Sequence, residues 1–167
     1  MLTDIVSKNG NLLINIVQTP EGDLEPDMLT TLEEIGDWIA IHGEGIYGTR
    51  PWKIYGEGPS TQKTQAGQFG GLKDVPDAGY TSEDFRFTAS KDGKTMYVFC
   101  MGKPTATLRI VSLGSDAEHA PAEIEKLSLL GQDKPLQWTQ QADALVIEIP
   151  DHETLSPAAG IKIEFKN

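Results

Sequence analysis

The start of the chain carries the apolar pattern of a short helix followed by a buried strand. The helix is predicted by apolar residues at helical spacing, namely Leu2, Ile5 and Val6. Asn9-Gly10 tolerates the left-handed backbone that ends many helices, so the helix should stop there. The next run, 12–17, is apolar except for Asn15. An unbroken apolar run of this length is typical of a parallel strand covered on both faces, so we expect a buried strand over 12–17.

A second helix has a clear beginning and end in the sequence. Pro26 suits the first helical position, Asp27 favours a helix N-terminus, and Gly43 supplies a C-terminal stop. Between them lies one apolar stripe at helical spacing: Leu29, Leu32, Ile35, Trp38 and Ile39. A strand followed by a helix is a βα unit, and a lone parallel strand needs neighbours on both sides. We therefore expect this beginning to be the end of something larger.

The chain changes character after Trp52. Residues 53–83 include a long stretch rich in Gly, Pro, Ser, Thr and Gln, with a glycine-rich segment at 67–71. A loop of this length is uncommon inside a compact domain, so we expect a domain boundary or a loop with a function.

From residue 84 onward the pattern is that of short antiparallel strands. Phe85, Phe87 and Ala89 alternate with more polar residues, and Asp92-Gly93 predicts a hairpin turn. The further strands are expected at 96–101, 106–112, 123–130, 136–140, 144–149 and 160–165. Strands of this length and spacing predict a small antiparallel β-sandwich.

Composition limits the possible partners. The 167 residues fit one ordinary domain, or a small domain with a piece of another, and 38% hydrophobic with 23% charged residues are globular values. The net charge of −11 argues against nucleic acid as a partner, because phosphate groups would repel it. No apolar stretch approaches the roughly 20 residues of a membrane-spanning helix, so no membrane insertion is expected.

Residues that commonly carry chemistry form no recognisable cluster. His42, His119 and His152 lack the spacing of metal ligands, so neither a metal nor a cofactor is expected. Cys100 is the single cysteine and lies in an apolar run, which indicates a buried structural thiol rather than a nucleophile. Asp4 lies on the first helix, where we expect a surface or capping role. Glu44 follows a helix end and is expected to be structural or exposed.

Two sets of segments carry a family resemblance. The N-terminal set consists of Asp4–Ile16, the loop with Pro20 and Gly22, the helix end Ile35–Trp38, and Gly43–Trp52. The later set consists of Phe85–Thr88 and the strands up to Tyr97, Leu129–Gly131, and Leu136–Trp138. Together they resemble the α-L-fucosidases of glycoside hydrolase family 29.

The resemblance implies the fold class and the domains. The fold expected is an α+β fragment, in which the last βα unit of a (β/α)8-type barrel is followed by an antiparallel β-sandwich. Residues 1–52 would be the incomplete end of the catalytic barrel, 53–83 a linker or long loop, and 84–167 the C-terminal β-sandwich domain.

The resemblance also implies a function for the complete protein. The family consists of retaining hydrolases that release terminal α-L-fucosyl groups from glycans, with one carboxylate as nucleophile and one as acid/base. Both carboxylates precede the segment that matches Ser7–Asn15, so we expect none of the catalytic residues here. The chain would be a fragment or a truncated product, inactive alone, whose partners are the missing barrel portion and, in the complete protein, a fucosylated glycan. Family members are often secreted, periplasmic or lysosomal, which leaves the compartment of this chain open.

Three residues are candidates for contact with sugar. In the family, the position of Leu12 lies close to the fucose pocket and would pack on the C6 methyl group, with barrel core packing as the alternative. Asn15 is expected at the active-site end of the strand, either in sugar contact or in a buried hydrogen bond to a neighbouring loop. Glu57 lies between two glycines that leave room for a ligand, although a solvated loop residue is the simpler interpretation.

An alternative function is a non-catalytic carbohydrate-binding or structural β-sandwich module. Sugar-binding sandwiches usually present exposed aromatic rings. Tyr97 and Trp138 lie within strand patterns and are expected to be mostly buried, which favours the structural version of this alternative.

Overall fold

Two antiparallel β-sheets form the body of the protein in the computed structural model, which describes residues 1–63 and 79–166. The five-stranded sheet has the order β1-β2-β3-β8-β5, and the three-stranded sheet has the order β4-β7-β6. The strands are β1 Thr49–Glu57, β2 Phe85–Ser90, β3 Thr95–Cys100, β4 Thr107–Ile110, β5 Ile124–Leu129, β6 Gln137–Gln140, β7 Leu145–Glu148 and β8 Ala159–Phe165. The strands expected after residue 84 are thereby confirmed, with small shifts at their ends.

The main core lies between the two sheets. It combines buried side chains of the five-stranded sheet, such as Phe87 and Val98, with those of the three-stranded sheet, such as Leu108 and Ile147. Strands β2 and β3 are buried on both faces, because Arg86, Thr88, Tyr97 and Phe99 on the opposite face are also covered. Both sides of these strands therefore require a packing partner.

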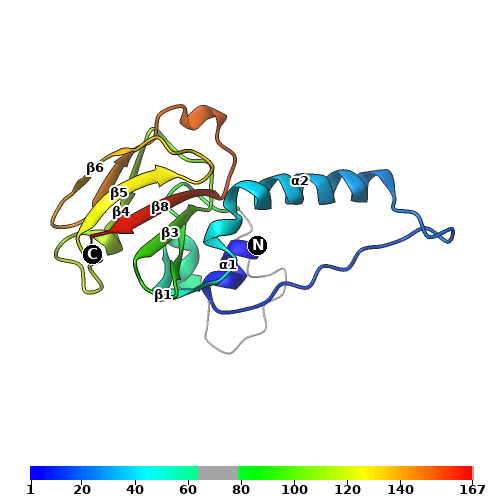
Figure 1. Cartoon of the computed structure of the whole chain (residues 1–167), viewed down its shortest axis with the longest axis horizontal. Helices are drawn as coiled ribbons and strands as arrows, with labels where there is room; N and C mark the ends of the chain where they lie inside the picture. Colours follow the sequence, from blue (N-terminus) through cyan, green and yellow to red (C-terminus); the bar gives the residue numbers. More distant parts are fainter. Residues whose placement is uncertain (64–78, 167) are drawn as a thin grey trace.

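The N-terminal elements cover that second, outer face. They are α1 (Leu2–Ser7), the C-terminal end of α2 (Pro26–His42) and the 3-10 turn η1 (Gly43–Gly45); Figure 1 shows α1 beside the sheet and the rest of α2 projecting away from it. A second cluster of buried side chains forms there: Ile46, Tyr97, Phe99, Met101 and Leu130, with Leu2, Val6, Trp38 and Tyr80 packed against it. The further short 3-10 turns are η2 (Pro59–Lys63), η4 (Val111–Leu113) and η5 (His152–Thr154).

Both predicted helices are confirmed, and they begin and end at the residues that the sequence indicated. After α1, Asn9 has a positive φ of 63° and the Gly10 N–H donates to the Ile5 carbonyl at 2.8 Å, which ends the helix. Pro26 is the first residue of α2 and Gly43 follows its last.

The strand predicted over 12–17 does not form. Residues 10–17 have no assigned secondary structure, and the segment runs as an extended arm away from the sandwich before α2 leads the chain back to it (Figure 1). All its apolar side chains except the half-buried Leu12 are exposed, with Leu13 the most exposed at 93%, and Asn15 is exposed rather than held in a buried hydrogen bond. A strand needs hydrogen-bonded neighbours, and within residues 1–63 and 79–166 none lies alongside 12–17.

Strand β1 was missed, because residues up to 52 were expected to form an exit turn and 53–83 a linker. Thr49 pairs with Ser90 and Glu57 with Phe85, across an irregular stretch between Pro51 and Gly56. Proline and glycine make this segment look like a loop, but an edge strand tolerates both. The first strand of the larger sheet therefore begins before the expected linker, of which 64–78 lie outside the described residues.

Candidate functional site

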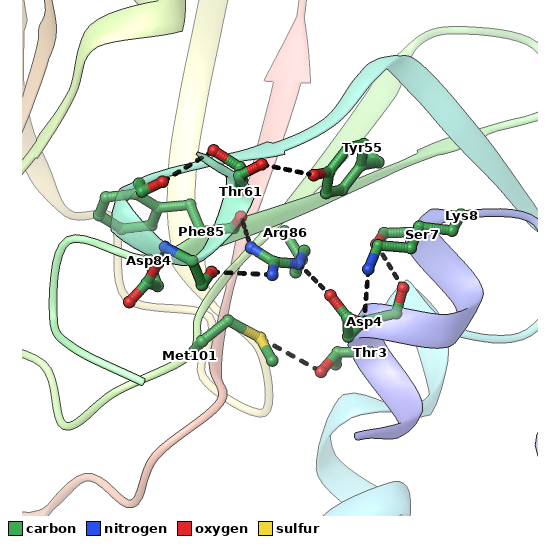
Figure 2. Close-up of polar contacts among 12 residues, drawn as sticks. Thr3, Asp4, Ser7, Lys8, Tyr55, Thr61, Asp84, Phe85, Arg86 and Met101 are labelled. Carbon is green, nitrogen blue, oxygen red and sulfur yellow. Dashed lines mark hydrogen bonds and ion pairs between the residues drawn. The ribbon is translucent and has the colours of Figure 1, made fainter. Parts of the chain in front are cut away.

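The outer face of β2 carries a buried arginine that joins three segments of the chain. Arg86 is 2% exposed. Its Nε donates to Asp4 Oδ1 of α1 at 2.5 Å, one terminal nitrogen donates to the Phe85 carbonyl at 2.9 Å, and the other to Ser60 Oγ at 2.9 Å. Figure 2 shows the guanidinium between α1 and β2, pointing at Asp4. A guanidinium has five N–H donors in a fixed fork, which suits several partners at once.

Aromatic rings flank the same guanidinium. The Arg86 Cζ atom lies 5.5 Å from the ring centroid of Tyr55 and 5.5 Å from that of Tyr80. Lys8 Nζ lies 5.0 Å from the Tyr55 ring as well. Cations over aromatic faces gain electrostatic attraction while the rings exclude water. Arg86 is thus shielded from solvent without losing favourable partners.

The partner of Arg86 is a carboxylate on the helix. Asp4 is 6% exposed and also accepts a hydrogen bond from Lys8 Nζ at 2.9 Å. Burial alone raises the pKa of Asp4, but hydrogen bonds from Lys8 and Arg86 outweigh burial, so its pKa lies below the ordinary value. The surface or capping role expected for Asp4 is wrong, because its carboxylate belongs to a buried ion pair.

The orientation of α1 also differs from the expectation. The side of the helix that is buried is polar and consists of Thr3, Asp4 and Ser7, whereas Leu2, Ile5 and Val6 are only half-buried. Thr3 Oγ1 lies 3.3 Å from Met101 Sδ, and the Ser7 hydroxyl donates to the Asp4 carbonyl at 2.9 Å (Figure 2). Polar contacts therefore determine which side of α1 faces the sheet.

A second carboxylate holds the loop that supplies Ser60. Asp84 is 1% exposed and accepts from the Ser60 N–H at 2.7 Å, the Thr81 N–H at 2.8 Å and the Thr81 hydroxyl at 2.9 Å. Burial raises the pKa of Asp84, but these hydrogen bonds prevail and its pKa lies below the ordinary value. The third partner of Arg86 is thus fixed in place by its own network.

The turn η1 makes a separate attachment to the same sheet face. Glu44 Oε1 accepts from the Tyr97 hydroxyl at 3.0 Å and from Lys162 Nζ at 2.6 Å. The Thr88 hydroxyl donates to the Gly45 carbonyl at 2.7 Å. Glu44 is therefore structural, as expected, and links η1 to β3 and β8.

An apolar groove of about 910 Å³ lies between the arm, α2 and the start of β1. Its apolar lining is Leu2, Val6, Leu12, Ile14, Ile35, Trp38, Ile39, Ile46 and Pro51. Of the three predicted sugar contacts, Leu12 lines this groove and Asn15 lies on the exposed arm beyond it. Further apolar side chains of the arm, Ile16 and Val17, are 44% and 62% exposed.

Glu57 is not brought together with Leu12 and Asn15. It lines a different, more polar groove and accepts the backbone N–H groups of Val111 at 2.8 Å and Ser112 at 2.7 Å. These groups open η4, so the Glu57 carboxylate serves as the cap of that turn and ties β1 to the segment after β4.

Removing this cap should weaken the protein moderately. We expect Glu57→Ala to lower the free energy of unfolding by about 1 kcal/mol, because two N–H groups lose their acceptor. Glu57→Gln keeps one oxygen acceptor and should cost less. Urea unfolding measures both, with Glu125→Ala, an exposed carboxylate on β5, as the control. Equal stability of Glu57→Ala and Glu125→Ala would contradict the capping role.

The Arg86–Asp4 pair was missed at the sequence level. One signal was present, since Arg86 lies between Phe85 and Phe87 in a strand. A charged residue there faces away from the core, and it needs a carboxylate partner if the opposite face is also covered. Its partner lies 82 positions away, so local patterns do not reveal it.

Three further features were considered in the described part of the chain: a metal site, the single cysteine and a membrane-spanning helix. No group of three or more His, Cys, Asp or Glu residues there is arranged to hold a metal ion. Cys100 is fully buried, as predicted, and burial raises the pKa of its thiol to about 12. Among the described residues, the helices are all too short or too polar to cross a membrane.

Two family profiles match the chain. The one described as alpha-L-fucosidase matches residues 1–44, and the one described as alpha-L-fucosidase C-terminal domain matches residues 79–164.

Similar proteins include the tissue alpha-L-fucosidase of Homo sapiens, 26% identical over 165 residues, which cover 98% of this chain and 28% of that protein. An alpha-L-fucosidase of Branchiostoma floridae is 40% identical over 53 residues, which cover 32% of this chain and 12% of that protein. The chain spans a little over a quarter of the length of the first curated relatives it matches.

Solved structures share the fold. The alpha-fucosidase of Thermotoga maritima, in complex with a mechanism-based inhibitor, superposes with a TM-score of 0.69 at 22% identity, over 97% of this chain and 32% of that one. Alpha-L-fucosidase isoenzyme 1 from Paenibacillus thiaminolyticus gives a TM-score of 0.66 at 19% identity, over 99% of this chain and 33% of that one.

Proposed function

Because the chain belongs to the α-L-fucosidase family, we propose that it is the C-terminal part of a retaining α-L-fucosidase that hydrolyses terminal α-L-fucosyl linkages in glycans. Retention requires two carboxylates about 5–5.5 Å apart at the ends of barrel strands. The proposal assigns both to a barrel portion outside these 167 residues. The chain itself would then bind the rest of the barrel and carry out no catalysis alone.

The observation that carries the proposal is the exposed apolar arm. Leu13, Ile14, Ile16 and Val17 are 93%, 43%, 44% and 62% exposed, and they fall within the segment that the fucosidase profile matches. A contiguous exposed apolar surface is typical of a protein interface. Every strand of a (β/α)8 barrel has a strand on each side. We propose that the missing barrel strands cover this arm and turn it into a strand.

Leu12 stays the predicted sugar contact of the complete barrel, since it lines the groove beside the arm. Asn15 stays a prediction of the same kind, on the exposed part of the arm. Glu57 is left out of the proposed site, because its carboxylate already accepts two backbone N–H groups on another side of the molecule.

The carbohydrate-binding alternative gains no support from the aromatic residues considered for it. Tyr97 is 5% exposed and its hydroxyl donates to Glu44, while Trp138 packs against the main core. The Tyr97 ring is therefore closed to a sugar, and the Trp138 ring is partly covered by the core.

The proposal is tested on the chain alone. We expect no hydrolysis of 4-nitrophenyl α-L-fucoside, because both catalytic carboxylates are assigned to the missing portion. Hydrogen–deuterium exchange of the monomer should show rapid exchange over 12–17, where backbone groups have no strand partner. Turnover abolished by Glu57→Gln, or slow exchange over 12–17 in a monomer, would overturn the proposal. The exchange of β3 and β8 in the same sample serves as the internal control.

A further inference from the structure

The contact between α1 and the sandwich combines a buried ion pair with the apolar packing of Leu2 and Val6. The buried side of α1 presents Asp4 to Arg86, while the apolar residues of the helix stay half-buried beside the groove. Both members of the pair are nearly inaccessible, at 6% and 2% exposure. Two buried charges stabilise each other only while both are present, since removing one leaves the other without compensation.

Arg86 connects three separate segments of the chain. Its three hydrogen-bonded partners come from α1, from the turn η2 and from its own strand β2. The Arg86 Cζ atom also lies over the rings of Tyr55 on β1 and of Tyr80, at 5.5 Å from each centroid. A planar guanidinium bound on its edge and on its faces has little freedom to turn. The direction in which it meets Asp4 is therefore fixed by the sandwich.

We propose that Arg86 is a positioning residue through which the β-sandwich determines where α1, and with it the start of the arm, is placed. A helix of six residues is too short to be stable by itself, so its position must come from its contacts. The connection from Asp4 to the arm is short and hydrogen-bonded, because the N–H groups of Lys8 and Gly10 donate to the Ile5 carbonyl and that of Asn9 donates to the Val6 carbonyl. The position of Asp4 therefore determines where the arm, which begins two residues before Leu12, leaves the sandwich.

This inference goes beyond the proposed function and does not rest on it. It concerns the placement of α1 in the 167-residue chain, and its readouts are structural rather than enzymatic. A chain that proves to have no role in fucose hydrolysis would still carry this contact. Conversely, failure of the contact would leave the proposed function standing.

The test compares hydrogen–deuterium exchange in variants of the full chain. The reporters are the hydrogen-bonded amides at the end of α1, namely those of Lys8, Asn9 and Gly10. Arg86→Met should speed their exchange about tenfold or more relative to the amides of β8, because Asp4 loses its buried partner. Arg86→Lys, which keeps the charge but not the fork, should fall between wild type and Arg86→Met. Arg109→Met, which breaks the exposed pair with Asp143, is the matched control and should leave these amides unchanged.

The variant Asp4→Asn is an independent test that keeps Arg86 and its other partners. It should speed exchange in α1 in the same way, and the double variant Asp4→Asn/Arg86→Met should match Arg86→Met within about threefold, since the two residues act as one contact. If Arg86→Met fails to fold, the comparison of Asp4→Asn with Arg109→Met decides. Unchanged α1 exchange in Asp4→Asn, or effects of the two variants that multiply, would overturn the proposal.

Discussion

Replacing Phe99 by alanine is expected to lower the free energy of unfolding by about 3–5 kcal/mol, the largest effect predicted for this protein. Phe99 is fully buried on the outer face of β3, with its ring centroid 6.1 Å from that of Trp38 and 6.5 Å from that of His42. Trp38 and His42 in turn stack on each other at 4.5 Å. The missing ring would leave a cavity where α2 and η1 meet the sheet.

Urea unfolding measures this change, and hydrogen–deuterium exchange of the C-terminal turn of α2 reports whether the end of the helix loosens. The matched control is Val111→Ala, since Val111 is an apolar residue that is 59% exposed and should change stability by less than about 0.5 kcal/mol. A loss below about 1 kcal/mol for Phe99→Ala would show that the outer face contributes little to stability.

Gly56→Ala is expected to destabilise the protein by about 1–3 kcal/mol. A Cβ at Gly56 would lie 2.2 Å from the Phe85 carbonyl oxygen and 2.9 Å from Arg86 Cδ, so β1 would have to move away from β2. Backbone atoms cannot give way as the end of a side chain can. The change therefore strains the sheet edge and the arginine contact together.

The control for Gly56→Ala has the opposite sign. Gly36 lies within α2, and a Cβ there would meet nothing within 4 Å. Gly36→Ala should therefore stabilise the protein by about 0.5–1 kcal/mol, because alanine restricts the unfolded chain and favours the helix. Thermal unfolding of both variants checks the pair. A Gly56→Ala variant as stable as the wild type or more stable would contradict the close approach of β1 and β2 at Gly56.

The elements predicted correctly are those whose signals are local. Pro26 and Gly43 enclose an apolar stripe, and the resulting helix has the expected ends. Asp92-Gly93 predicted the turn between β2 and β3, where Gly93 has a positive φ of 73°. In both cases a few neighbouring residues determine the backbone, so a sequence pattern is sufficient.

The errors arise where the outcome depends on distant partners. The run at 12–17 has the composition of a buried strand, but a strand forms only against another strand, and apolar side chains alone do not supply one. Strand β1 was missed for the opposite reason, since its place at the sheet edge accepts the Pro51 and Gly56 that local rules assign to loops.

The candidate site could be predicted only in part. Leu12 lines an apolar groove, but the sugar contact that the family resemblance implies for it stays a prediction. The interpretation of Glu57 as a solvated residue overlooked its two backbone partners, which belong to η4, more than fifty positions later in the chain. The pairing of Asp4 with Arg86 likewise depends on the way β2 lies against α1. Such pairings follow from topology, which sequence periodicity does not specify.

The arm has one consequence for the thermodynamics of association. It leaves the sandwich after α1, which Arg86 holds, and the chain comes back through α2 to η1, which Glu44 and Gly45 hold on the same sheet (Figure 1). The segment from the arm through α2 is thus attached to the sheet at both ends in the chain alone. Closing a chain segment costs conformational entropy, and this loss is already part of the folding of the sandwich. A barrel strand that paired with the arm, as proposed above, would lose less free energy to ordering it, and the association would be tighter than the same contacts made by a free peptide.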